Sequence, residues 1–115
     1  PLEGSCVHYR VKRAEDFHGK HLLILGGGDS ALDWTLDFAD RAASVTLVHR
    51  RAEFRAAPAS VARMKALADA GRIAWREGVV QSVETADGRL AGAVVKCNDG
   101  VLHRVDCNQL LAFFG

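Results

Sequence analysis

The sequence His21-Leu22-Leu23-Ile24-Leu25-Gly26-Gly27-Gly28-Asp29-Ser30-Ala31 decides the fold. Its first five residues are an apolar run that is too short for a buried helix and ends at glycines, which favours a buried parallel strand. Gly26, Gly28 and Ala31 then occupy the three fixed places of the pattern G-x-G-x-x-G/A. The first allows a tight turn, the second lets backbone approach a pyrophosphate, and the third permits close packing of helix on strand. The stretch therefore predicts a dinucleotide-binding turn.

A strand–helix–strand unit surrounds this turn. A helical run from Asp29 to about Arg41 follows the glycines, and Ser44–His49 then forms a second strand, which completes the unit that the glycine pattern requires. The start of the helix presents free N–H groups to the phosphates, and Ser30 can add its hydroxyl. Asp29 is interpreted more simply as an acid of the first helical turn than as a direct ligand.

The second strand ends in basic residues, where NAD-binding proteins place an acid for the ribose 2′-hydroxyl. His49 occupies that place, and Arg50, Arg51 and Arg55 follow it. Guanidinium groups suit a 2′-phosphate, so the sequence predicts NADP(H) in preference to NAD(H). Two engaged arginines would contribute about 3 kcal/mol, or roughly a hundredfold preference. A solvated basic loop is the alternative interpretation.

Composition indicates one folded domain with a local positive charge. The 115 residues are 49% hydrophobic, which is enough for a folded core. The formal net charge of +1 is too small to indicate binding to nucleic acid. Basic residues concentrate between Arg41 and Lys65, and a cluster beside the glycine turn suits a small phosphorylated ligand. No apolar run is long enough to span a membrane. Three cysteines, far apart in sequence, suggest reduced thiols in a cytoplasmic protein.

The rest of the chain predicts a parallel sheet with an antiparallel insertion. We expect a linker from a neighbouring domain at residues 1–18, a helix from Pro58 to about Ala70 and a strand at Arg72–Arg76. An antiparallel meander should follow, with strands Val79–Ala86, Leu90–Cys97 and Val101–Val105 and a hairpin turn at Asp87-Gly88. The last strand is expected at Gln109–Phe114. The meander is expected to cover one sheet face and shows no sign of chemistry. Because the chain starts without a methionine and stops in an apolar strand, we expect an excised domain.

Patterns typical of catalytic and metal-binding sites do not occur in the sequence. The histidines and cysteines have no metal-ligand spacing, and the residues around Ser30 do not form a nucleophile elbow. A second glycine fingerprint for FAD and a C-x-x-C pair are also absent. A nicotinamide needs an acceptor for its hydride, and this chain shows none.

The segments Lys20–Ala31 and Val45–Ala56 resemble, in order and spacing, the two signatures of the NADPH domain of thioredoxin-reductase-like flavoproteins. The similarity extends from about Cys6 to Gly115. It implies an α/β, Rossmann-like FAD/NAD(P)-binding domain over residues 1–115, with a parallel sheet flanked by helices and an inserted three-stranded antiparallel β-meander. It also implies contacts to the cofactors from the glycine turn, from the arginines after the second strand, and from Gly115 at the end of the last strand.

The same family places a redox C-x-x-C before the first strand of this domain, where the present chain has His8-Tyr9-Arg10-Val11. The chain therefore resembles most the dithiol-free branch, the ferredoxin-NADP reductases of thioredoxin-reductase type. The resemblance implies an NADPH-dependent flavoprotein oxidoreductase that moves hydride between NADPH and FAD and passes electrons to ferredoxin or a similar carrier. FAD would lie in a partner domain of a full-length homodimer, and the fragment alone would bind NADP without catalysis. Two alternatives stay open: a thioredoxin-reductase homologue with another acceptor, and a non-catalytic NADP-sensing module.

Overall fold

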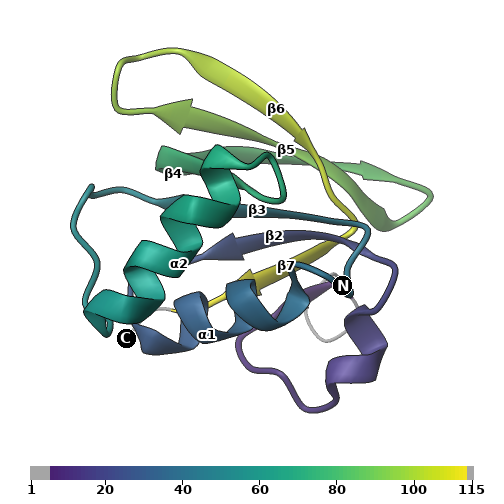
Figure 1. Ribbon diagram of the computed structural model, residues 1–115. Helices are drawn as coiled ribbons and strands as arrows, with labels where there is room; N and C mark the ends of the chain where they lie inside the picture. The colour runs from purple at the N-terminus through teal and green to yellow at the C-terminus, as the bar shows by residue number, and fades with distance from the viewer. Residues whose placement is uncertain (1–5, 114–115) are drawn as a thin grey trace.

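A computed structural model describes residues 6–113 as a seven-stranded sheet with helices α1 and α2 on one side of it (Figure 1). In chain order, the elements are β1 (Val7–His8), the 3-10 helix η1 (Ala14–Phe17), β2 (His21–Leu25), α1 (Asp29–Phe38), β3 (Ser44–His49), α2 (Pro58–Asp69), β4 (Ala74–Ala86), β5 (Arg89–Cys97), β6 (Leu102–Asp106) and β7 (Gln109–Ala112). The strand order across the sheet is β1-β7-β2-β3-β4-β5-β6. The Rossmann-like fold predicted from the sequence is confirmed.

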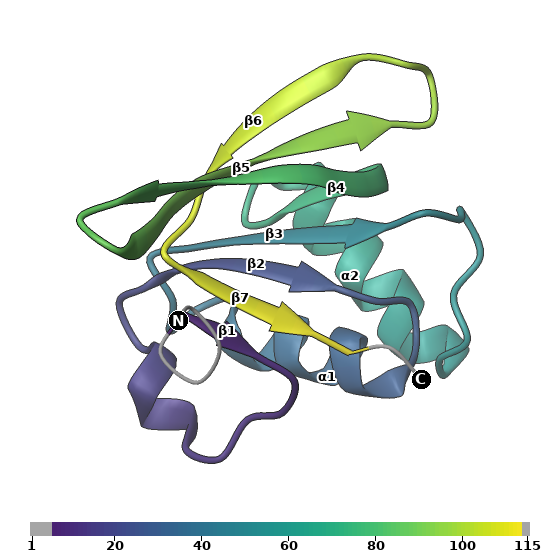
Figure 2. The same cartoon turned by 180° about the vertical axis from the view of Figure 1, so that it is seen from behind.

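The parallel half of the sheet places the ends of β2 and β3 side by side. Leu25 at the end of β2 pairs with Val48 near the end of β3. The last strand, β7, rejoins this parallel half, as expected, and the structure places it between β1 and β2 (Figure 2). The loops that follow β2 and β3 therefore emerge at the same edge of the sheet, which is the edge where α/β sheets bind ligands.

Both helices bury an apolar stripe against one face of this sheet. Leu32 and Phe38 of α1 and Met64 of α2 are fully buried in a cluster with residues of β2, β3 and β7. Helix α1 ends at Phe38, before the expected Arg41, because the N–H of Arg41 bonds the Phe38 carbonyl three residues back and tightens the chain into a turn. Pro58 occupies the start of α2, as the sequence predicts. Among residues 6–113, no helix is both long and apolar enough to cross a membrane.

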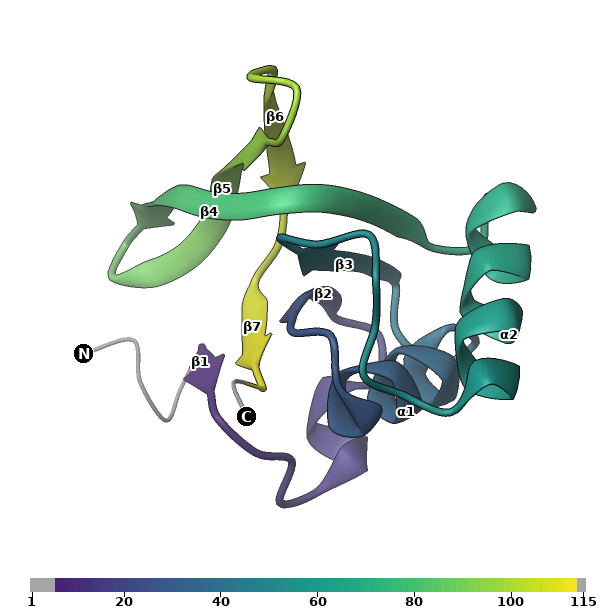
Figure 3. The same ribbon diagram turned by 90° about the vertical axis from the view of Figure 1, so that its left-hand side faces the viewer.

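One long strand, β4, replaces the two strands that the sequence predicts at 72–76 and 79–86. Its first residues pair with β3 in parallel, and from Gly78 onward it pairs with β5 in antiparallel fashion. At the change of partner, a Cβ on Gly78 would stand 2.3 Å from the carbonyl oxygen of Lys96, so only glycine lets the two backbones approach there. Figure 3 shows β4 running from the helical side of the molecule into the meander. The separate strand at 72–76 is therefore wrong, since the chain has no break between the two pairings.

The predicted meander is confirmed as the second half of β4 with β5 and β6. Asp87 and Gly88 connect β4 to β5 with φ values of 54° and 76°, which fits the expected two-residue hairpin turn. Ala93 and Val95 of β5 are fully buried in a cluster with Leu23 of β2 and with residues of β3 and β7. The meander thus covers the sheet face opposite the helices, as expected.

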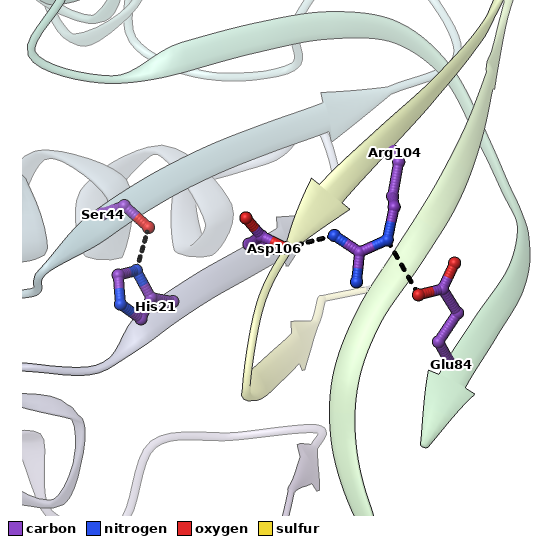
Figure 4. A network of polar contacts seen from close by, with 5 residues as sticks. All are labelled: His21, Ser44, Glu84, Arg104 and Asp106. Carbon is purple, nitrogen blue, oxygen red and sulfur yellow. Dashed lines mark hydrogen bonds and ion pairs between the residues drawn. The ribbon is translucent and has the colours of Figure 1, made fainter. Parts of the chain in front are cut away.

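Polar contacts tie neighbouring strands together away from the glycine turn (Figure 4). Arg104 of β6 donates to Glu84 of β4 at 2.8 Å and also bonds Asp106, so one guanidinium joins the two outer strands of the meander across β5. His21 Nδ1 and Ser44 Oγ lie 2.8 Å apart at the starts of β2 and β3. These contacts fix strand positions at a distance from the predicted ligand edge.

Candidate functional site

The glycine turn follows β2 at the carboxyl edge of the sheet. Gly26 has φ +139°, which L side chains rarely adopt, and its N–H bonds the Val48 carbonyl of β3 at 3.1 Å. A Cβ on Gly26 would stand 2.5 Å from the carbonyl oxygen of Phe113 and 3.2 Å from the Cβ of the fully buried Ala31. Close packing within the chain therefore explains the small residues Gly26 and Ala31 at the first and third positions of the predicted pattern.

The imidazole ring of His49 explains why residue 27 is a glycine. A Cβ on Gly27 would stand 2.3 Å from His49 Nε2, so the ring lies directly on the glycine backbone. The same Nε2 donates to the Glu53 carbonyl at 3.0 Å, and the ring packs on Phe54 with centroids 5.1 Å apart. His49 thus joins the glycine turn to the loop after β3. The sequence placed His49 beside a phosphate and did not predict this packing role.

The loop that carries the arginines, residues 50–55, is held by its main chain at three points. The N–H of Arg55 donates to the Gly27 carbonyl at 2.7 Å, and Gly28 and Arg55 form a parallel bridge. The Glu53 carbonyl is held by His49. The Arg50 carbonyl accepts a hydrogen bond of 2.8 Å from Asn98 Nδ2, which lies in the turn between β5 and β6. The backbone of this loop, called here the arginine loop, is therefore fixed against both the glycine turn and the meander.

The side chains of the arginine loop face solvent. Arg50, Arg51 and Arg55 are exposed, and within residues 6–113 none of the ion pairs involves them. The structure thus brings the predicted arginines next to the glycine turn, and no carboxylate of residues 6–113 forms an ion pair with them. Such groups are suited to an anionic ligand.

The wider basic cluster predicted between residues 41 and 65 does not form. Arg41 pairs with Asp37 at 3.6 Å and its carbonyl accepts from Gly19, just before β2 begins, so it lies at the opposite edge of the sheet. Lys65 on α2 lies 5.7 Å from the centre of the Trp75 ring. The prediction of one cluster was wrong, because β3 carries the chain from Arg41 at one edge of the sheet to the arginine loop at the other, and Lys65 lies on α2 beyond that loop.

The start of α1 meets the glycine turn. Gly28 is the residue before the helix, and Asp29 and Ser30 form its exposed first turn. Asp29 Oδ1 accepts a hydrogen bond of 3.1 Å from the N–H of Ala57 just before α2, which gives this carboxylate a structural role. The N–H groups of the first turn have no partner within the helix, so they and the Ser30 hydroxyl can bind an anion.

Gly28 is the one glycine of the turn that packing within the chain does not explain. A Cβ there would have Arg55 O, 3.9 Å away, as its neighbour, which is an ordinary contact. The space that a Cβ on Gly28 would enter is open, and in the G-x-G-x-x-G/A pattern this glycine lets backbone approach a pyrophosphate. The arrangement therefore offers backbone N–H groups and open space to an anionic group. Gly115, the remaining predicted contact, lies outside the described residues.

Asn98 is the residue that the sequence interpretation missed at this site. The sequence predicts only a turn at Asn98-Asp99-Gly100, between the expected strands Leu90–Cys97 and Val101–Val105, and turn residues give no signal of a long-range partner. In the structure, Asn98 lines a shallow groove of about 300 Å³ between β4 and the β5–β6 turn, together with Trp75, Arg76, Cys97 and His103. Among residues 6–113, no group of histidines, cysteines and carboxylates is arranged to hold a metal ion.

Cys97 and Cys107 are free thiols in the structure. Cys107 is buried between the meander and the parallel sheet, and burial raises the pKa of its thiol to about 11. Cys97 is half-buried at the groove. Cysteines 97 and 107 are too far apart in sequence for a C-x-x-C, so the described chain offers no redox dithiol of that type.

Comparison with known proteins gives a family match over nearly the whole chain. Residues 1–113 match the model of the pyridine nucleotide-disulphide oxidoreductase family. A ferredoxin–NADP reductase from Bradyrhizobium diazoefficiens is 51% identical over 98% of the chain, and one from Mesorhizobium japonicum is 50% identical over 100% of it. The chain spans 33% and 34% of these two relatives, about a third of their length.

A solved structure of similar fold is the thioredoxin reductase from Streptococcus pyogenes. It superposes with a TM-score of 0.82 over 98% of the chain and 37% of its own length, at 23% sequence identity. This similarity supports the fold independently of sequence.

The thiols give the first testable prediction. At about pH 8, iodoacetamide should modify Cys97 of the native protein well before Cys107, because burial and a raised pKa keep Cys107 as the unreactive thiol. Peptide mass spectrometry after timed quenching measures both rates. Since the folded pKa is raised, the fold favours the neutral thiol, and the free energy of unfolding should fall as the pH rises from about 9 to 11.

In denaturant the two thiols should react at similar rates, which serves as the control. Equal rates in the native protein would contradict the buried position of Cys107.

Proposed function

Since the chain belongs to the pyridine nucleotide-disulphide oxidoreductase family, we propose that it is the NADP(H)-binding domain of an FAD-dependent reductase. One observation carries the proposal: the glycine turn, the start of α1 and three exposed arginines meet at one edge of the sheet, and no carboxylate of the described residues pairs with these arginines. A pyrophosphate and a separate 2′-phosphate are the two anionic groups of NADP, and this edge offers two adjacent anion-binding features.

The two features divide the ligand between them in this proposal. The N–H groups at the start of α1, the open backbone at Gly28 and the Ser30 hydroxyl would hold the pyrophosphate. The guanidinium groups of the arginine loop would hold the 2′-phosphate by charge-assisted hydrogen bonds. His49 would act indirectly, because its Nε2 already donates to the Glu53 carbonyl and its ring supports the loop. Asp29 would act mainly by holding Ala57.

The chemistry belongs to the cofactors and to a partner domain. When bound, the nicotinamide supplies or accepts a hydride, and this chain's residues bind and orient it. The remaining two thirds of the related reductases leave room for an FAD domain in the full-length protein. The names of the relatives favour ferredoxin, or a similar carrier, as the onward acceptor. A homodimer in the cytoplasm is the proposed state of that full-length protein.

Thioredoxin is the competing acceptor, since the fold resembles that of a thioredoxin reductase. The place of the family's redox dithiol is taken by residues 8–11, which include no cysteine. His8 in this segment instead bonds Gln109 of β7, with 2.7 Å between His8 Nε2 and the amide oxygen. The absence of a cysteine pair at residues 8–11 favours a one-electron carrier over a disulfide substrate as the electron acceptor. A non-catalytic NADP-sensing module would be favoured if the full-length protein bound no FAD.

The cofactor assignment predicts the behaviour of a double variant. Arg50→Ala with Arg51→Ala should weaken NADP binding by roughly a hundredfold and NAD binding by less than about threefold, because only NADP carries the 2′-phosphate. Titration calorimetry of the chain with each nucleotide measures both constants.

A matched control removes the same charge elsewhere. Arg10 and Arg89 are exposed and lie beside β1 and at the far end of the β4–β5 hairpin. Replacing both with alanine should leave the ratio of NADP to NAD affinity unchanged. An equal loss for NADP and NAD in the Arg50/Arg51 variant would overturn the assignment of the 2′-phosphate.

Gly28 predicts a second, different binding defect. Gly28→Ala should weaken NADP and NAD alike, by roughly tenfold or more, because the methyl group enters the space proposed for the pyrophosphate. The melting temperature should change little, since the new Cβ meets protein only at 3.9 Å. Thermal melting and calorimetry on the same sample separate the two effects. Unchanged affinity for both nucleotides would place the pyrophosphate elsewhere.

The acceptor is tested on the full-length protein. With NADPH as donor, we expect reduction of ferredoxin and no reduction of thioredoxin, because the chain has no C-x-x-C to pass electrons to a disulfide. Stopped-flow absorbance of flavin and ferredoxin follows the electrons. Thioredoxin reduction at a comparable rate would support the competing acceptor instead.

A further inference from the structure

We infer that Asn98 is a positioning residue for nucleotide specificity, because it holds the part of the arginine loop that carries Arg50 and Arg51. The inference rests on the proposed function and adds a role for the meander, which lies far along the chain from the fingerprint. Asn98 and Arg50 are separated by 48 residues in sequence, and the contact between them is a side-chain donor on a main-chain carbonyl.

The donor itself is held firmly. The N–H of Asn98 bonds the Glu77 carbonyl of β4 at 2.9 Å, so the residue is attached to the strand next to β3. The turn around it is closed by a bond of 2.9 Å from the N–H of Gly100 to the Cys97 carbonyl and by one from the N–H of Val101 to Asp99 Oδ1. The amide of Asn98 is therefore presented to Arg50 from a structured turn.

The hydrogen bond from Asn98 is the anchor nearest to Arg50 and Arg51, because the other anchors lie toward the far end of the arginine loop. His49 holds the Glu53 carbonyl, and Gly27 holds the N–H of Arg55. The hydrogen bond from Asn98 holds the carbonyl between Arg50 and Arg51, and so acts on the backbone from which both guanidiniums extend. Each exposed arginine loses considerable rotamer freedom when it binds, and a fixed backbone reduces the further loss of main-chain freedom.

Asn98 also lines the groove beside the loop, so a direct contact with the nucleotide is the competing explanation. The two explanations differ in what they affect. A residue that acts through the arginines affects only NADP, and only while the arginines are present. A residue that touches the adenosine affects NADP and NAD equally, with or without the arginines.

The test begins with Asn98→Ala. We expect NADP binding to weaken by about three- to tenfold, the effect of losing one hydrogen bond, and NAD binding to change by less than about twofold. Asn108→Ala is the control, since it removes an asparagine side chain whose Oδ1 accepts from the N–H of His21 at the start of β2, away from Arg50, and it should leave the ratio of NADP to NAD affinity unchanged. Melting temperatures of both variants show whether each is folded.

A double-mutant cycle completes the test. In the background of Arg50→Ala with Arg51→Ala, the Asn98→Ala change should have no further effect on NADP binding. An effect of full size in that background, or an equal loss for NAD, would overturn the positioning role and indicate direct contact. An unchanged NADP affinity in folded Asn98→Ala would also overturn it.

The two levels of proposal fail separately. If the Arg50/Arg51 variant itself keeps its preference for NADP, the proposed function of the arginine loop fails. If that variant loses the preference while Asn98→Ala keeps it, only the role of Asn98 fails.

Discussion

The close approach of the imidazole of His49 to the bare backbone of Gly27 is the contact on which the rest of the site depends. Because β2 and β3 pair in register, the turn after one strand and the loop after the other leave the sheet at the same edge. A Cβ at position 27 would stand 2.3 Å from His49 Nε2, so a side chain there would displace the ring from its place on the turn. The hydrogen bonds from Arg55 to Gly27 and from His49 to Glu53 then become possible.

This geometry places two sources of positive potential side by side with little loss of folding free energy. The start of α1 contributes N–H groups that the helix cannot satisfy, and the arginine loop contributes full charges that remain solvated. Neither feature requires burial of an unpaired charge, which would be expensive. The proposed site can therefore stay open to solvent without a large loss of stability.

The meander has two functions in this arrangement. Its inner face completes the core, with Ala93 and Val95 packed in the cluster that includes Leu23. Its β5–β6 turn reaches past the sheet edge and contacts the arginine loop through Asn98. The long strand β4 makes both possible, because it belongs to the parallel sheet at one end and to the meander at the other. A structural insertion thus lies within hydrogen-bond distance of the proposed specificity loop.

The sequence by itself determined the local chemistry: the strand, turn and helix around Gly26–Ala31, the arginines after β3, the meander and its Asp87-Gly88 turn. These depend on short-range constraints, such as backbone torsions, apolar periodicity and residue spacing, which one segment carries alone. Only the tertiary structure decided that β4 is continuous, that Arg41 lies at the opposite edge, that His49 supports the loop and that Asn98 holds Arg50. These facts depend on which segments meet in space, and a polar side chain in a turn gives no sign of a hydrogen-bond partner 48 residues away.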